Sequence, residues 1–255
     1  MKTLNWALLT TCLSMGLASG AAAVPYTIDD GTNSQPGADQ YIGAGAAGDV
    51  FGGSEDFEVF GMNVSSNMDY LYVDVATYFE EHSSWKYGDL FISTDGWKAF
   101  GPAPYASDDA GNGESWEFAV DVSSLTSGGF ADLVNLSGAT ILNSDDLHSA
   151  SSVRGETGDE QEVAYGSGGI INAESVALSI TGEDRTNATI TNLSFRIALA
   201  DLGLNALTPQ EIGLRWTMSC ANDITEGSYT VPEPGTLALL GLGLLGLGMR
   251  KRVKS

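Results

Sequence analysis

Apolar and polar residues alternate along much of the central part of the chain. Every second residue from 116 to 122 is apolar, and the same pattern recurs over residues 193–200 and 211–220. A β-strand points successive side chains to opposite faces, so each segment has one face for a core and one for solvent. The pattern therefore predicts antiparallel strands that pack on a single core.

Weaker strand patterns and frequent turn residues extend this prediction over most of the chain. The weaker candidates are residues 57–64, 70–79, 89–93, 139–142, 161–165 and 176–180. Clusters of Gly, Ser, Asn and Asp separate them, and only residues 200–210 hint at a helical turn. No repeat of fixed period is present, which argues against a solenoid or propeller. We expect residues 24–230 to form an all-β domain, an antiparallel β-sandwich or jelly roll.

The N-terminus has the three parts of a secretory signal peptide. Lys2 provides a positive charge, residues 4–17 are mostly apolar, and Ala21 to Ala23 offer a small-residue cleavage site. We predict that residues 1–23 direct Sec-type export and are then removed. The lipoprotein alternative would use Cys12, but Thr11 is a poor residue before a lipidated cysteine and the apolar run continues past it.

The last 25 residues form a second signal, which also has three parts. Pro232, Glu233 and Pro234 make an extended peptide, because each proline fixes φ and removes a backbone donor. An uncharged run over 237–249 follows, and it would span roughly 20 Å as a helix against about 30 Å of bilayer core. A basic stop closes the chain and favours the cytoplasmic side; it contains Arg250, Lys251 and Arg252. These cations and the Pro-x-Pro segment fit a buried C-terminal helix badly, while a plain membrane anchor is the other alternative.

This order of Pro-Glu-Pro, Leu/Gly-rich run and basic end resembles the PEP-CTERM sorting signal of Gram-negative bacteria. The resemblance covers residues 231–255, about a tenth of the chain. It implies that an exosortase processes the protein. It also implies that the protein is held transiently in the inner membrane before it reaches the cell surface or extracellular matrix. It also implies an association with exopolysaccharide and biofilm.

The domain between the two signals is strongly acidic. It keeps six of the 11 Lys and Arg residues but 32 of the 33 Asp and Glu residues, which gives a formal net charge of −26. Electrostatic repulsion excludes nucleic acid and anionic membrane surfaces as partners. Cys220 is the one cysteine left after export, so no internal disulfide forms. In the alternating pattern of residues 211–220, Cys220 falls on the apolar face, which places it in the core.

No residue pattern in the domain predicts catalysis. Neither His82 nor His148 has metal-ligand spacing, and no nucleophile elbow or phosphate-binding glycine loop occurs. We therefore predict that the protein is not an enzyme and has no catalytic residues. A secreted glycan-active enzyme is the third choice, since a glycosidase needs two carboxylates about 5 to 10 Å apart in space.

Calcium is the one candidate ligand ion, and no other cofactor is expected. Oxygen ligands and glycines crowd into the loop that contains Asp108, Asp109, Asn112 and Glu114. The loop departs from an EF-hand, since the twelfth position is Ala119 in place of a bidentate glutamate. A solvated acidic loop is the simpler interpretation.

A glycan-binding platform is the candidate binding site. Trp85, Tyr87 and Trp97 gather near several charged residues, and the segments 89–97 and 212–216 are loosely similar to strands of carbohydrate-binding-module-like sandwiches. Partial burial at a sheet edge is the alternative for these aromatics. Trp116 and Trp216 are in phase with core residues and are expected to be structural. Arg196 and Arg215 are predicted on polar strand faces, paired with surface carboxylates.

Two function hypotheses follow. The first is a non-enzymatic exported protein of the surface or extracellular matrix. The second is a carbohydrate-binding module that uses the platform aromatics.

Overall fold

The computed structural model describes residues 25–31, 41–43, 50–51, 55–81, 84–148, 161–167, 169–185, 188–205 and 209–232. The predicted signal peptide and the sorting tail beyond Pro232 lie outside these residues. The same holds for Glu233, Pro234, the apolar run and the basic stop. None of the helices in the described ranges is long and apolar enough to cross a membrane.

The domain is all-β, as the alternation predicts. Ten antiparallel strands form one sheet in the order β1-β2-β3-β10-β9-β6-β5-β4-β11-β12, and two more form a small second sheet. The strands of the large sheet are β1 (Tyr26–Asp29), β2 (Val59–Ser66), β3 (Tyr70–Thr77), β4 (Leu90–Ser93), β5 (Phe118–Asp121), β6 (Phe130–Asn135), β9 (Ile170–Arg185), β10 (Ala188–Ala198), β11 (Gln210–Thr217) and β12 (Ile224–Val231). The second sheet pairs β7 (Thr140–Asn143) with β8 (Glu162–Ser167). Short helices are η2 (Glu55–Phe57), η3 (Val122–Ser124) and α1 (Ser144–Leu147).

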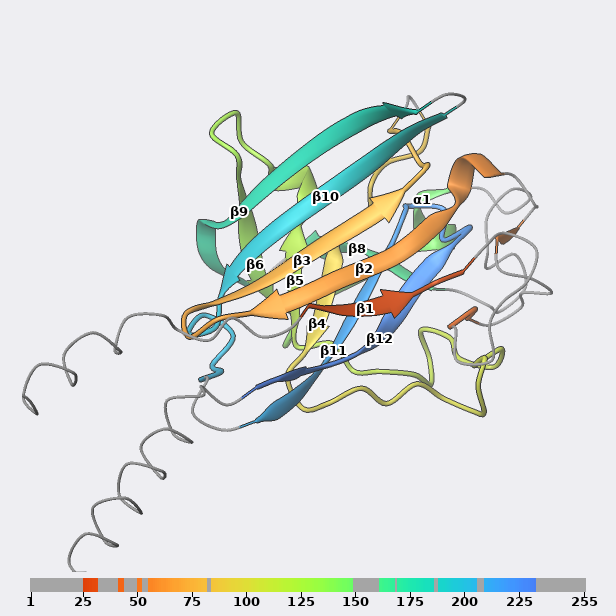
Figure 1. The fold of residues 1–255 in the computed structure, drawn as a ribbon. Helices are drawn as coiled ribbons and strands as arrows, with labels where there is room; N and C mark the ends of the chain where they lie inside the picture. Colours follow the sequence, from red (N-terminus) through yellow and green to blue (C-terminus); the bar gives the residue numbers. More distant parts are fainter. Residues whose placement is uncertain are drawn as a thin grey trace, which may run out of the picture.

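The large sheet folds over on itself into two layers. Figure 1 shows β1, β2, β3, β10 and β9 in front, with β6, β5, β4, β11 and β12 crossing behind them. The two ends of the sheet meet, because β12 lies against β1 and β2. A hydrogen bond of 3.0 Å between Ser66 Oγ of β2 and Tyr229 OH of β12 joins them. The predicted sandwich class is confirmed.

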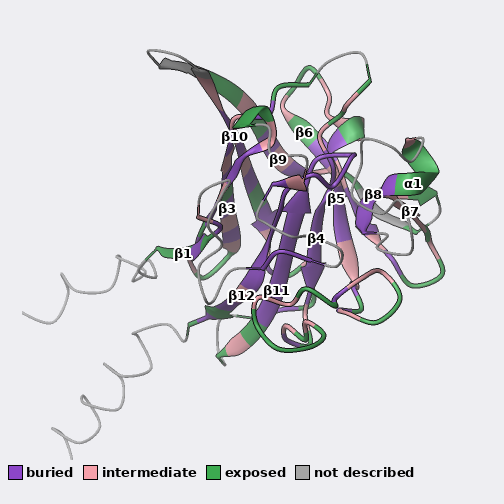
Figure 2. Cartoon of the chain, turned by 90° about the vertical axis from the view of Figure 1, so that its right-hand side faces the viewer, coloured by how far each residue is buried: buried purple, intermediate pink, exposed green. Residues whose placement is uncertain are grey.

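The core lies between these layers. Figure 2 shows β4, β11 and β12 mostly buried. Trp216 and Cys220 are fully buried in this core, in agreement with their predicted phase. Trp116 is also buried, but it packs in a second cluster with Phe91 and Ala119 and not with Val120 and Val122, so its predicted phase is wrong. The Trp216 indole donates to the carbonyl of Gly88 at 3.1 Å, which satisfies its one polar atom inside the core.

Three strands, β1, β6 and β12, were not predicted from the sequence. β12 has a largely polar sequence, ITEGSYTV, yet seven of its eight residues are not exposed. β1 and β6 are short and interrupted by aspartate or asparagine. Where the sequence hints at a helical turn over 200–210, turns with backbone bonds such as Leu202 N to Leu199 O and Gly203 N to Ala200 O follow β10, and β11 begins at Gln210. β12 pairs with the preceding strand β11, β6 with β5 and β9, and β1 with β2, so pairing and packing supply what the local pattern lacks.

Candidate functional site

The outer face of the front layer carries polar side chains in register. On β3, β10 and β9 every second residue points away from the core. Strand pairing places these residues in three rows across the sheet: Tyr72–Arg196–Ala177, Asp74–Ser194–Ser179 and Ala76–Asn192–Thr181. Neighbouring rows are about 6.8 Å apart and neighbouring strands about 4.8 Å apart, as strand geometry requires.

The middle row continues onto the next two strands. Asn63 of β2 lies opposite Asp74, and Thr27 of β1 lies opposite Asn63. Thr27 Oγ1 donates to Asn63 Oδ1 at 2.9 Å, which orients the amide. Five strands therefore contribute hydroxyl, amide or carboxylate groups to one line on the surface.

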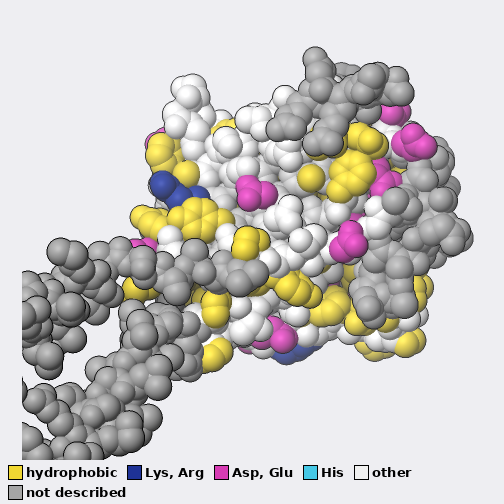
Figure 3. Space-filling model, in the orientation of Figure 1, with side chains coloured by type: hydrophobic (Ala, Val, Ile, Leu, Met, Phe, Trp, Pro, Cys, Tyr) yellow, Lys and Arg dark blue, Asp and Glu magenta, His cyan; other side chains and the backbone are white. Residues whose placement is uncertain are grey.

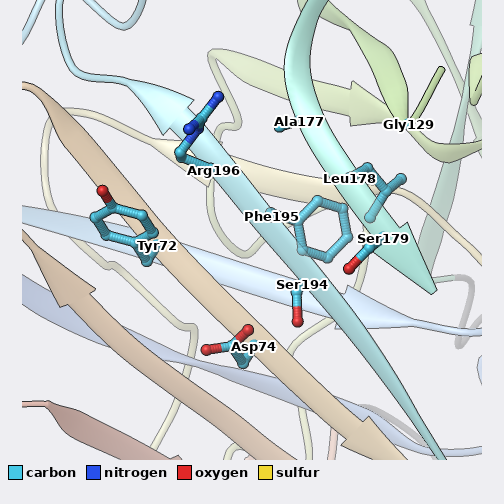
Figure 4. A pocket seen from close by; sticks show the side chains of 9 residues that line it. All are labelled: Tyr72, Asp74, Gly129, Ala177, Leu178, Ser179, Ser194, Phe195 and Arg196. Atoms are coloured by element: carbon cyan, nitrogen blue, oxygen red, sulfur yellow. The ribbon is translucent and has the colours of Figure 1, made fainter. Parts of the chain in front are cut away.

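Two adjoining hollows of about 350 and 560 Å³ lie over these rows and share Asp74 and Ser194. We call them together the outer-face groove. Figure 4 shows the larger part of its polar lining, with side chains from three neighbouring strands. The residues that line the groove are Phe60, Tyr72, Asp74, Ala76, Gly129, Ala177, Leu178, Ser179, Thr181, Ile190, Asn192, Ser194, Phe195 and Arg196.

Aromatic rings flank the polar rows on both sides. The Arg196 guanidinium lies 5.0 Å from the centroid of the Tyr70 ring, and the Tyr72 hydroxyl accepts from Asn67 Nδ2 at 3.0 Å. Phe60 packs edge-on against Tyr78, with ring centroids 4.7 Å apart. These contacts hold the rings in place before any ligand arrives.

The groove has little net charge on a strongly acidic domain. Among the described residues that line it, Arg196 is the one cation and Asp74 the one carboxylate. Figure 3 shows this face as mostly uncharged polar surface, with hydrophobic groups to either side and few charges. A fixed donor, a fixed acceptor, hydroxyls, an amide and ring faces suit an uncharged ligand rich in hydroxyl groups.

The predicted platform residues Trp85 and Tyr87 lie elsewhere and are partly buried. Both pack against the main core. The Trp85 ring lies 4.5 Å from the His148 ring, and the Tyr87 ring 5.5 Å from that of Phe79. Burial is the largest cause that raises the pKa of Tyr87.

Trp97 packs against a different cluster. Its ring meets Tyr105 edge-on at 5.1 Å, and its indole donates to Glu226 Oε1 at 2.7 Å. Trp97 therefore covers a buried carboxylate, while Trp85 and Tyr87 pack on the main core. Whether any of the three binds glycan stays a prediction.

Most oxygens of the predicted calcium loop accept hydrogen bonds from nearby groups, while Asp108 Oδ1 is buried without a hydrogen-bond partner among the described residues. Asp109 Oδ1 accepts from Gly111 N at 2.7 Å, and Glu114 accepts from the backbone N–H of Lys98 and of Ser115. Asn112 donates to the carbonyl of Ser107 at 3.1 Å. Asp108 is turned into the protein, and burial is the largest cause that raises its pKa. Within the described ranges no group of three His, Cys, Asp or Glu side chains is placed to hold a metal ion.

The prediction for Arg215 is wrong. Arg215 is 2% exposed, and its Nη1 lies 2.7 Å from Oε2 of Glu226, which is itself buried. Its other amino group, Nη2, donates to Gln161 Oε1 at 2.6 Å, and Nη1 also reaches Tyr41 OH at 3.1 Å. The polar face of β11 is covered by these residues and by Trp97, so its cation needs buried partners. Arg196, by contrast, is exposed as predicted.

The alternation of β3 and β10 was the available signal for the groove. It marks Tyr72, Asp74, Ser194 and Arg196 as residues of the face opposite the core. The pattern does not say that β10 and β3 are neighbours, because their pairing joins segments more than 100 residues apart. The groove residues were therefore not predicted as a site.

The C-terminal end of the domain leads directly into the sorting signal. Residues 230–252 match the family model of the PEP-CTERM protein-sorting motif. No curated protein and no solved structure matched the chain. The predicted sorting signal is thereby confirmed, with an exosortase as the processing partner. The chain is an exported protein that passes through the membrane toward the cell surface.

Proposed function

We propose that this PEP-CTERM protein is a non-enzymatic protein of the cell surface or extracellular matrix, and that it binds neutral polysaccharide along its outer-face groove. The observation that carries the proposal is the set of three in-register polar rows between two groups of aromatic rings. The sorting signal supports the location, because it places the sandwich outside the inner membrane.

The spacing of the rows supports a polymeric ligand. Outward side chains recur about every 6.8 Å along each strand and about every 4.8 Å across strands. Successive sugar rings of an extended chain can thus each meet a hydroxyl, amide or carboxylate. Because the groove lies open on the sheet surface, a long chain can settle on it from the side without an end having to enter.

The charge of the domain favours an uncharged glycan. A uronic-acid polymer would be repelled by a net charge of −26, while Arg196 alone offers it a cation in the groove. A neutral glycan meets no such repulsion. Its hydroxyls can donate to Asp74 and accept from Arg196, and its ring faces can pack on Tyr72 or Phe60.

The carboxylate content of the groove supports binding without hydrolysis. A glycosidase uses two carboxylates about 5 to 10 Å apart across the scissile bond. Asp74 is the single carboxylate among the described residues of the groove. With no second acid or base beside it, it is suited to hydrogen bonding.

Affinity electrophoresis of the mature protein in gels containing soluble neutral or acidic polysaccharides tests this proposal. We expect retardation by at least one neutral polymer, such as the neutral fraction of the host's own exopolysaccharide. Asp74→Ala should weaken binding about tenfold or more, since a charge-assisted hydrogen bond contributes about 1.5 to 3 kcal/mol. Glu80→Ala removes an exposed carboxylate outside the groove and should leave binding unchanged. No retardation by any polymer, or equal loss in both variants, would contradict the proposal.

A further inference from the structure

The sorting motif begins inside the folded domain. Its first two matched residues, Thr230 and Val231, are the last two of β12. They pair with Glu211 and Gln210 of β11, and Val231 is only 1% exposed. Pro232, the first residue of the Pro-Glu-Pro triplet, follows at once and is exposed. The folded domain and the triplet are thus directly adjacent, with no linker between them.

Both chain ends of the domain lie at this same end of the sandwich. β1 starts at Tyr26, opposite Val64 of β2, and β12 ends beyond Tyr229, which bonds to Ser66 at the end of β2. Figure 1 shows the start of β1 and the end of β12 at the end of the sandwich that carries the turn between β2 and β3. We call this region, made of Tyr26, Met68, Thr230, Val231 and Pro232, the sorted end.

Two large apolar side chains are exposed at the sorted end. Tyr26 is 54% exposed and Met68, in the turn after β2, is 48% exposed. Met68 follows Ser66, which bonds to Tyr229 near the end of β12, by two residues, and Tyr26 lies opposite Val64 on the same part of β2. On a domain with a charge of −26 such side chains are poorly placed to rest on an anionic lipid surface. A protein surface is the better match for them.

We propose that the exosortase docks on the sorted end itself, with Met68 in the contact, and reads the triplet while β12 stays paired. A peptide-processing enzyme commonly holds several extended residues on either side of the bond it acts on. On the N-terminal side of Pro232 those residues are in the sheet. Releasing them would expose Val231 and Tyr229 and break the bond to Ser66, so binding the folded end avoids that cost. This inference does not depend on glycan binding.

An insertion that moves the triplet away from the domain tests the proposal. The sequence Gly-Ser-Gly-Ser-Thr-Val, placed between Val231 and Pro232 of the full chain, keeps Thr-Val before the triplet but adds a flexible spacer. Tail removal is followed in the host by pulse-chase and intact mass. We expect processing to slow at least fivefold. Processing at the rate of the unmodified chain, or faster, would overturn the proposal. An enzyme that recognises only a free peptide would bind the triplet more easily when a spacer separates it from the domain.

Substitutions of Met68 give a second, independent measurement. Met68→Glu and Met68→Lys both remove the apolar contact and should both slow processing. Leu147→Glu is the matched control, since Leu147 is 40% exposed on α1, away from the sorted end. If only Met68→Glu slows processing, the side chain meets anionic lipid and the docking proposal fails. If Leu147→Glu slows processing as much as the two Met68 variants do, a new charge anywhere on the surface slows processing, and the proposal fails as well. Thermal unfolding of each purified chain checks that it is folded.

Discussion

Arg215 on β11 and Glu226 on β12 lie directly opposite each other, with Nη1 and Oε2 2.7 Å apart, and both are almost fully buried. Tyr41 and Gln161, from two distant parts of the chain, also accept from Arg215, and Glu162 Oε2 lies 4.0 Å from its Nη1. The Trp97 indole bonds to the other oxygen of Glu226. This ion pair and its neighbours therefore bind the segments that contain Tyr41, Trp97 and Gln161 to the outer face of β11 and β12.

Replacing Arg215 by methionine should destabilise the domain strongly. The change leaves the Glu226 carboxylate buried without its cation, a situation that costs about 3 to 5 kcal/mol. The double variant Arg215→Met, Glu226→Leu should cost clearly less than the sum of the two single changes, because the carboxylate nearest to the missing cation is also removed. Glu162, whose Oε2 lies 4.0 Å from Arg215 Nη1, is the carboxylate that stays. Urea unfolding measures the free energies. The exposed Arg196→Met is the control and should change stability by less than about 0.5 kcal/mol. Additive single effects would show that the two charges do not depend on each other.

The stability of the domain should fall as the pH rises through neutrality, because of Asp89. This carboxyl accepts from Val122 N and Tyr165 N, yet burial raises its pKa to about 7. The unfolded value is lower, so the folded state binds the extra proton between about pH 4 and 7. Its contribution to stability is complete below about pH 4 and is lost as the pH passes about 7.

Asp89→Asn gives the measurement for this group, since asparagine does not titrate. Relative to that variant, the native protein should lose up to about 1.4 kcal/mol of unfolding free energy per pH unit from pH 5 to 7. Urea unfolding at several pH values provides the comparison. Parallel pH profiles for the two proteins would contradict the assignment.

Gly61 should not tolerate a side chain. It has a φ of +112° at the irregular pairing between β2 and β3, and a Cβ there would lie 2.1 Å from the carbonyl oxygen of Ile28. Gly61→Ala should therefore cost at least about 2 kcal/mol and loosen β1. Gly138 also has a positive φ, +75°, but nothing lies within 4 Å of its Cβ position. Gly138→Ala should cost about 1 kcal/mol, and equal losses in thermal unfolding would refute the steric argument.

Trp97→Ala should separate the two possible glycan sites. It removes the indole that bonds to Glu226, so we expect lower stability with unchanged affinity for polysaccharide. Affinity electrophoresis below the unfolding temperature provides the test. If the folded variant loses binding while Asp74→Ala keeps it, the binding surface lies at Trp97 and the outer-face groove is not the site.

The class of fold, the burial of Trp216 and Cys220 in the main core, and the sorting signal could all be predicted from the amino-acid sequence. These properties are local. A period of two fixes which side chains share a face, and the Pro-Glu-Pro triplet with its apolar and basic neighbours is read as a linear peptide.

What each face of a strand packs against depends on the fold of the whole chain. Alternation places Arg215 on the face opposite Trp216, but it cannot show that Tyr41, Gln161 and Trp97 cover that face and bury the cation. Likewise, Asp74 and Ser194 become neighbours only because β3 pairs with β10 across more than 100 residues. Long-range pairing and covering loops are set by the packing of the whole chain, so the groove and the buried ion pair could not be predicted from any one segment.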